Sequence, residues 1–150
     1  MTTPLYSTLS SALKGYKPWR ELVDRLRAGP YPVTVAGPRG SYFAFVAAEI
    51  ARKTVGSLLI IVPTEQEAES VVGDLRLFGH EPVLIPWWGS MPYRPLPRTA
   101  PVFGQRTRAL SRLLREERPV VVASLRASLT PVPAPARFGA RLLSIRVGDA

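Results

Sequence analysis

The sequence predicts an α/β protein in which a mostly parallel sheet is sandwiched between helices. Two observations lead to this prediction. Short runs of β-branched and aliphatic residues alternate along the chain with longer segments of helical periodicity, which is the pattern of successive βαβ units. The run over 57–62 is also apolar without alternation, as expected of a strand that a parallel sheet buries on both faces.

The first helix is predicted from apolar residues that share one helical face. These residues recur at i, i+3, i+4 and i+7 and are Trp19, Leu22, Val23 and Leu26. Gly29 and Pro30 end the helix, because glycine favours a helix C-terminus and proline cannot continue it. We expect the residues before this helix to form a loose leader.

A strand and a second helix come next. Residues 31–36 predict a strand because β-branched residues cluster in a short run between Pro30 and Gly37. Residues 41–53 predict a mostly apolar helix rich in alanine and phenylalanine, which Gly56 closes.

The strand over 57–62 is followed by a capping box. Thr64 and Glu67 are spaced so that the hydroxyl and the carboxylate satisfy free N–H groups at a helix start. This helix should extend to about Phe78. Its buried stripe should consist of Ala68, Val71, Val72, Leu75 and Phe78. Residues 82–85 then predict a third short strand.

Residues 86–101 are rich in proline and aromatic residues and predict a stiff, extended loop, because proline removes backbone donors. A helix is expected over 102–117, with leucines on one side and arginines largely on the other. Residues 119–123 predict a fourth buried strand, after which Ser124 caps a short helical turn. Pro131, Pro133 and Pro135 mark a linker, and 141–147 predict one more strand.

Composition excludes several classes of protein. The chain has 150 residues, 46% of them apolar, which is enough for a sizeable core and argues against disorder. No run is long enough to span a bilayer, and the N-terminus does not resemble a secretion signal, so we expect a cytoplasmic protein without membrane contact. There is no cysteine, and His80, expected at the surface, cannot alone build a metal site.

Charge is distributed unevenly. The net charge of +9 divides into +1 over residues 1–85 and +8 over residues 86–150, where all 11 basic side chains are arginine. A cationic half of this kind indicates an anionic partner such as nucleic acid. A GC-rich coding sequence also favours arginine over lysine, so composition alone does not decide between the two explanations.

The loop after the first predicted strand stands where a phosphate-binding P-loop would stand. A working P-loop follows G-x-x-x-x-G-K-[ST], in which the lysine reaches the β- and γ-phosphates. In this chain the two glycine positions hold Thr34 and Arg39, and the lysine position holds Gly40. Only Ser41 matches the pattern. We therefore expect Gly37, Arg39, Gly40 and Ser41 to form a vestigial phosphate loop that binds no cofactor.

No other catalytic or metal-binding arrangement is visible in the sequence. The acidic residues of the predicted helices, including Glu49 and Glu65, are expected on solvated faces, and no acidic ATPase box is present. We therefore predict no catalytic residue and no metal ligand.

The loop over 87–98 interleaves aromatic residues with arginines. Such residues can stack on bases and pair with phosphates, but prolines and tryptophans also favour packing over the strand ends, which is the interpretation we prefer. The candidate nucleic-acid-binding residues are Arg94, Arg98, Arg106, Arg108 and Arg112.

Several motifs in this order resemble the N-terminal module of the bacterial transcription-repair coupling factor family. The resemblance extends over about 30–149 and rests on Gly37-Pro-Arg-Gly-Ser41, Ile60-Ile-Val-Pro-Thr64, Trp88-Gly-Ser-Met-Pro-Tyr93, Gln105-Arg106 and the motif Val120-Val-Val-Ala-Ser-Leu-Arg-Ala127. That module is similar to the first domain of excinuclease B, whose P-loop is intact. Arg39 and Gly40 place this chain with the coupling factor, whose loop is degenerate.

The resemblance implies a P-loop NTPase-like three-layer sandwich with a degenerate nucleotide loop. Full-length members of the family are ATP-dependent DNA translocases that remove stalled RNA polymerase and recruit excinuclease A. Their ATP- and Mg-dependent motor lies downstream, so we expect no enzyme activity here. The expected divisions are a leader and helix over 1–29, a helicase-like domain over 30–130, and a linker with the start of a truncated insertion domain over 131–150.

These observations favour a non-hydrolytic scaffold and regulatory module of transcription-coupled nucleotide excision repair. The alternative is a stand-alone basic α/β module that binds nucleic acid through the arginines named above. A diverged P-loop ATPase is a third hypothesis.

Overall fold

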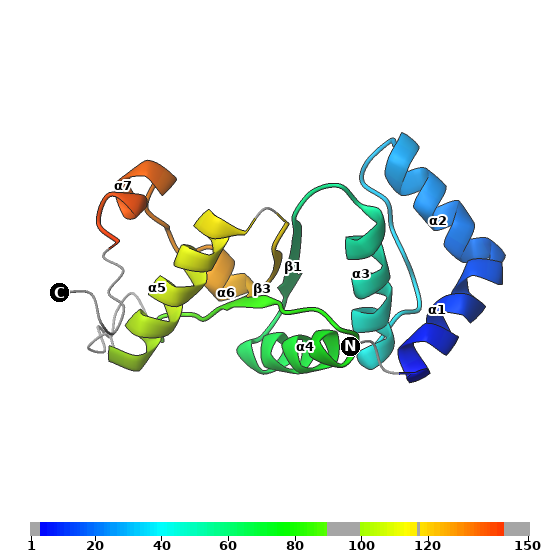
Figure 1. Cartoon of the computed structure of the whole chain (residues 1–150), viewed down its shortest axis with the longest axis horizontal. Helices are drawn as coiled ribbons and strands as arrows, with labels where there is room; N and C mark the ends of the chain where they lie inside the picture. Colours follow the sequence, from blue (N-terminus) through cyan, green and yellow to red (C-terminus); the bar gives the residue numbers. More distant parts are fainter. Residues whose placement is uncertain (1–3, 90–99, 117, 143–150) are drawn as a thin grey trace.

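The computed structural model describes residues 4–89, 100–116 and 118–142. The molecule is elongated, with α1 and α2 at one end, α5 and α7 at the other, and the sheet between them (Figure 1). The elements in chain order are α1 (Pro4–Gly15), α2 (Lys17–Ala28), α3 (Ser41–Lys53), β1 (Leu58–Val62), α4 (Glu65–Leu77), β2 (Val83–Ile85), α5 (Ala100–Arg115), β3 (Val120–Ser124), α6 (Leu125–Ser128) and α7 (Pro135–Gly139).

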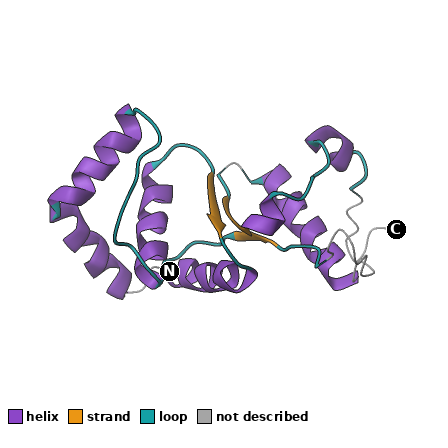
Figure 2. Ribbon diagram, turned by 180° about the vertical axis from the view of Figure 1, so that it is seen from behind, coloured by secondary structure: helices purple, strands orange, loops and turns teal. Residues whose placement is uncertain are grey.

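The sheet has three strands in the order β1-β3-β2, and both pairings are parallel. Val122 of β3 stands in register between Ile60 of β1 and Leu84 of β2. All five residues of β3 are buried, because β3 has a neighbouring strand on each side and helices over its faces. The predicted α/β class with a parallel sheet is confirmed (Figure 2).

The main core lies between the sheet and the helix pair α3 and α4. Val122, Leu75 and Ala68 are fully buried there and carry the contact between β3 and α4. The predicted stripe of α4 is confirmed except at its last member, because Phe78 lies just beyond the helix and is half-buried. On the opposite face α5 contacts β2 and α6 contacts β3, so helices lie on both faces.

Strand β1 is buried on one face only, which corrects the prediction for residues 57–62. Ile60 and Val62 are buried in the core, but Leu59 is 57% exposed and Ile61 is 49% exposed. The reason is the position of β1 at the edge of the described sheet, where β3 is its one neighbouring strand. An apolar run therefore identified the strand correctly but did not reveal that it is an edge strand.

Residues 31–36 do not form a strand, which contradicts the sequence prediction. They run from α2 to α3 as an unpaired segment alongside both helices, away from the sheet (Figure 1). The β-branched residues Val33, Thr34 and Val35 favour extended backbone, but a strand also needs a hydrogen-bonded neighbour. This segment has none among the described strands.

The expected loose leader is helical over its described part, since α1 covers most of the residues before α2. Tyr6 and Leu13 of α1 pack with Trp19, Phe45 and Val46, forming a second core cluster on the outer side of α3. The Tyr6 hydroxyl donates a hydrogen bond to the buried carboxylate of Glu49. Burial, followed by this carboxylate, raises the pKa of Tyr6 to about 12.

Two helix caps confirm their predictions. The Thr64 hydroxyl accepts a hydrogen bond from the backbone N–H of Glu67 at 3.2 Å, as the capping-box spacing indicated. The Ser124 hydroxyl accepts from the N–H of Ala127 at 3.0 Å and caps α6. Both caps satisfy helix N–H groups that would otherwise lack a partner.

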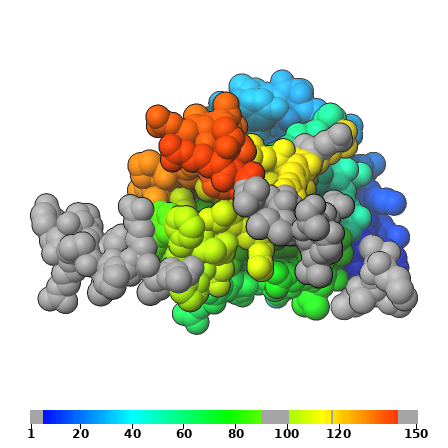
Figure 3. Space-filling model, turned by 60° about the vertical axis from the view of Figure 1, so that its left-hand side comes forward, coloured from blue at the N-terminus to red at the C-terminus, as the bar shows by residue number. Residues whose placement is uncertain are grey.

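The C-terminal part adds a helix that the sequence did not predict. The proline-rich linker includes α7, which lies against α5 on one face of the molecule (Figure 3). The expected strand over 141–147 and most of the loop over 86–101 lie outside the described residues. Within the described part of the chain, no helix is long and apolar enough to cross a membrane.

Replacement of Leu75 by alanine should lower the free energy of unfolding by about 2–5 kcal/mol, because it removes a fully buried side chain from the main core. Leu77 of the same helix is 67% exposed and provides the matched control. Leu77→Ala should change stability by less than about 0.5 kcal/mol. Urea unfolding measures both, and equal losses would contradict the location of the core.

The free energy of unfolding should decrease as the pH is lowered below the ordinary pKa of histidine, and His80 is the cause. Burial and then Arg52 lower the pKa of this half-buried ring, whose Nε2 donates to the Ala48 carbonyl at 3.2 Å. The unfolded chain therefore binds the proton more readily than the folded one. The contribution of His80 to the free energy of unfolding is thus present above about pH 6.5 and is lost below it. Urea unfolding at several pH values should show a weaker acid loss in His80→Gln, and parallel curves would contradict this assignment.

Candidate functional site

The carboxyl ends of the three strands bring together chemically distinctive residues at one edge of the sheet. Glu65 follows β1 at the start of α4, Trp87 follows β2, and Ser124 ends β3. Ligands of parallel α/β sheets bind at this edge, so it is the first place to look for a site.

A single carboxylate connects these three strand ends. The Ser124 hydroxyl donates to Glu65 Oε1, and the backbone N–H of Trp87 donates to Glu65 Oε2 at 3.4 Å. Ser124 is 1% exposed, so its polar group is fully committed within the protein. The sequence predicts Glu65 on a solvated face, and the structure corrects this: its carboxylate ties β1, β2 and β3 together.

Arg106 lies inside the protein on the α5 side of this edge. It is 2% exposed, its Nη1 donates to the Pro86 carbonyl at 2.8 Å, and its guanidinium lies 5.1 Å from the Trp88 ring centre. Its Nη2 has no hydrogen-bond partner among the described residues. Burial lowers the pKa of Arg106, and the charge of Glu65 partly opposes this effect.

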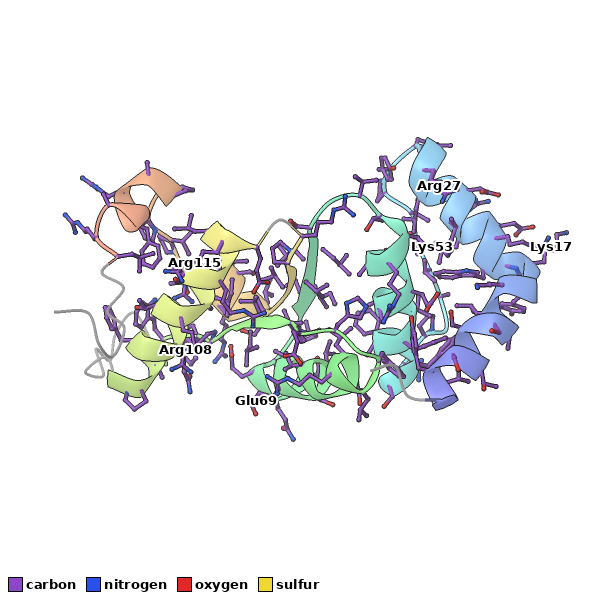
Figure 4. All side chains as sticks on the ribbon, in the orientation of Figure 1. Lys17, Arg27, Lys53, Glu69, Arg108 and Arg115 are labelled. Atoms are coloured by element: carbon purple, nitrogen blue, oxygen red, sulfur yellow. The ribbon has the colours of Figure 1, made fainter. Side chains whose placement is uncertain are left out.

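The five candidate nucleic-acid-binding arginines do not form one surface among the described residues. Arg106 is buried, and Arg112 pairs with Glu116 at 2.6 Å and also donates to the carbonyls of Glu81 and Pro82. Arg108 is exposed on α5 (Figure 4). Arg94 and Arg98 lie outside the described residues.

The described tryptophans of the aromatic loop pack against the protein. Trp88 contacts Phe103 with ring centres 6.1 Å apart, and the guanidinium of Arg126 lies 5.2 Å from the Trp87 ring centre. Both tryptophans are only partly exposed. This arrangement favours packing over base stacking for this part of the loop.

The vestigial phosphate loop lies apart from the hydrogen bonds that Glu65 forms with Ser124 and Trp87. Gly37, Arg39, Gly40 and Ser41 are all exposed, and no strand of the described sheet precedes them. Gly40 has a φ of 53° and makes no side-chain cap at the start of α3. Because this left-handed backbone favours glycine, a lysine at this position would be strained.

Comparison with known proteins gives two curated relatives, and no family model and no solved structure matches. Each relative is 30% identical to this chain over 155 aligned residues, which is 98% of the chain, and they come from Mycobacterium tuberculosis (strain CDC 1551 / Oshkosh) and Mycobacterium bovis (strain ATCC BAA-935 / AF2122/97). Both are transcription-repair-coupling factors. This chain is similar to transcription-repair-coupling factors. The resemblance predicted from the motifs is confirmed.

The similarity to the coupling factors covers only part of those proteins. The chain spans about 12% of the length of each curated relative it matches. The comparison therefore relates this chain to one part of a much longer coupling factor.

Two residues that anchor this coupling-factor-like chain are not identified by the sequence. Glu49 is predicted on a solvated face, but it is 3% exposed and bound to Tyr6. The available signal is its position within the otherwise apolar run over 42–51. Arg106 is predicted on the outer side of its helix, but it is 2% exposed. The available signal is Ala109, a small apolar residue on the same helical face that is also buried.

Among the described residues, no group of three or more His, Cys, Asp or Glu could hold a metal ion.

Replacement of Ser124 by alanine should lower the free energy of unfolding by about 1–2 kcal/mol, because it removes the α6 cap and a donor to Glu65. Ser128 is an exposed serine in the same helix that bonds only the Leu125 carbonyl, at 2.8 Å. Ser128→Ala should change stability by less than about 0.5 kcal/mol. Thermal and urea unfolding measure the difference, and equal effects would contradict the role of Ser124.

Proposed function

We propose that this chain is a non-hydrolytic scaffold and regulatory module of a transcription-repair coupling factor. Similarity to two such factors along 98% of the chain supports the family assignment. The proposal places the chain in transcription-coupled nucleotide excision repair. Its contribution there is to hold and position other parts of the repair machinery, and the chemistry of ATP belongs to another part of the factor.

The observation that carries the non-hydrolytic proposal is the state of the phosphate loop. Gly40 occupies the position of the P-loop lysine, so the loop has no cation at the position from which that lysine reaches the β- and γ-phosphates. Its backbone is left-handed at that position, and the loop is not held at the end of a described strand. The missing lysine and the missing strand each remove part of what a P-loop needs, and the left-handed backbone at Gly40 disfavours a lysine there.

The carboxyl edge of the sheet supports the scaffold role. In a nucleotide-binding α/β protein this edge supplies groups that contact the ligand. Here the Glu65 carboxylate bonds Ser124 and Trp87, and Arg106 bonds Pro86. Polar groups that could contact a nucleotide instead form hydrogen bonds that connect the strand ends. The edge therefore stabilises the fold.

The alternative, a stand-alone nucleic-acid-binding module, receives less support from the geometry. Of the five arginines considered, Arg106 is buried and Arg112 is engaged by Glu116 and by the carbonyl of Glu81. A phosphate-binding surface should weaken steeply as salt rises, and a flat response would exclude this alternative.

The partners of the proposed module follow from the whole coupling factor. We propose that DNA, RNA polymerase and excinuclease A interact with the full-length protein to which this module belongs. ATP and Mg would act in the motor of that protein. The candidate residues of this chain therefore have structural roles, and no catalytic residue is assigned.

Nucleotide should leave the melting temperature unchanged if the loop binds no phosphate. A ligand at about 100 times its dissociation constant stabilises the folded state by about 2.7 kcal/mol, so a functional site would give a clear rise. Differential scanning fluorimetry with millimolar Mg-ATP, compared with tripolyphosphate at equal ionic strength, makes this measurement. A rise specific to ATP, or ATP hydrolysis by the purified chain, would contradict the proposal.

A further inference from the structure

A cationic hollow of about 280 Å³ lies along α2, beside the last turns of α1 and α3. We call it the α2 hollow. Four exposed basic side chains line it, and Asp24 is the one acidic residue among its described lining residues. The four cations are Lys14, Arg20, Arg27 and Lys53. Figure 4 shows Arg27 on α2 and Lys53 on α3 at this end of the molecule.

The four cations of the α2 hollow are free within the described part of the chain. None of their side chains forms an ion pair or a hydrogen bond with another described residue. In contrast, Lys17 on the same helix is paired with Glu21 at 3.7 Å. Free cations that line one hollow repel each other, and an anion between them removes that repulsion. The charge of the hollow therefore favours an anionic ligand.

Helix stability does not explain all four cations. Lys14, Arg27 and Lys53 each lie in the last turn of a helix, where a cation stabilises the helix dipole. Arg20 lies in the first turn of α2, where the dipole disfavours a cation. It is exposed and unpaired among the described residues, so its position contributes to the hollow without stabilising the helix.

The two arginines of the hollow are spaced along α2 like phosphates along a nucleic-acid strand. Arg20 and Arg27 both line the hollow and are two helical turns apart, which is about 10.5 Å along the helix axis. A nucleic-acid strand carries one phosphate about every 3.4 Å of its axis. The two guanidinium groups therefore span about three phosphates.

The floor of the hollow offers little to a ligand that binds through apolar or stacking contacts. Its apolar lining residues are Trp19, which is 5% exposed, and Val23, which is half-buried. A peptide needs apolar anchors or a free backbone edge, and a nucleic-acid single strand needs exposed rings on which its bases stack. Contacts to phosphates need only free cations, so the hollow fits a duplex backbone best.

We propose that the α2 hollow binds the phosphate backbone of double-stranded nucleic acid without reading its base sequence. The guanidinium groups of Arg20 and Arg27 donate hydrogen bonds to phosphate oxygens, and the ammonium groups of Lys14 and Lys53 add charge. The carboxylate of Asp24 lowers the affinity, because it lies in the same lining.

This site is separate from the surface of the stand-alone nucleic-acid-binding alternative, since none of the five arginines considered there lines the hollow. The proposal also uses neither the nucleotide loop nor the scaffold role. Failure to bind a duplex would therefore leave the proposed function unaffected.

Fluorescence anisotropy of the full chain with a short labelled DNA duplex, repeated at several salt concentrations, tests the site. Arg20→Gln with Arg27→Gln should weaken binding about three- to tenfold at low salt. The same pair should reduce the slope of log affinity against log salt by about 1.8, because each lost phosphate contact removes about 0.9. The matched pair Arg108→Gln with Arg115→Gln removes equal charge from exposed arginines of α5 and should change affinity by less than about twofold.

A gain of affinity provides a second test that an unfolded variant cannot pass. Asp24→Asn removes the carboxylate from the lining and should strengthen duplex binding about two- to threefold. Oligoglutamate of equal charge should compete at least about tenfold less well than unlabelled duplex, because its lower charge density releases fewer condensed counterions. Equal losses in the two arginine pairs, no gain in Asp24→Asn, equal competition by oligoglutamate, or tighter binding of a single strand than of the duplex would overturn the proposal.

Discussion

The structure depends on the insertion of β3 between β1 and β2. The two outer strands do not pair with each other, so neither forms a sheet until the last described strand of the chain joins them. β3 is buried along its whole length and contacts β1, β2 and α4, all of which precede it by many residues. Because these contacts join residues far apart in sequence, loss of β3 would leave the helices without a common surface.

Polar residues at the carboxyl edge of the sheet connect the ends of the three strands at the candidate site. Glu65 binds the end of β3 through Ser124 and the residue after β2 through Trp87, while Arg106 holds Pro86. The same edge in a nucleotide-binding relative of this fold would face a ligand. Here Glu65, Ser124 and Arg106 form hydrogen bonds within the protein, which agrees with the proposed structural role.

Aromatic and cationic side chains occur at both ends of the molecule. At the α5 end, aromatic and arginine side chains pack on each other, as Trp88 does with Arg106 and Phe103. At the α2 end, tyrosines, unpaired backbone and cations remain open to solvent. Among the described residues the arginine-rich half contains engaged side chains, such as Arg106 and Arg112, as well as exposed ones, such as Arg108, because charge counts do not show which cations are already bound.

The sequence by itself determined the elements whose signals are local: the helix over 41–53, the three paired strands, the caps at Thr64 and Ser124, and the missing lysine at Gly40. Only the tertiary structure decided which extended segments pair, which face of β1 is covered, and which charges are buried. Residues 31–36 have strand composition but no partner strand among the described residues, and Arg106 and Glu49 have surface composition but interior positions. The physical reason is that pairing and burial depend on distant residues, whereas propensity and capping depend on adjacent ones.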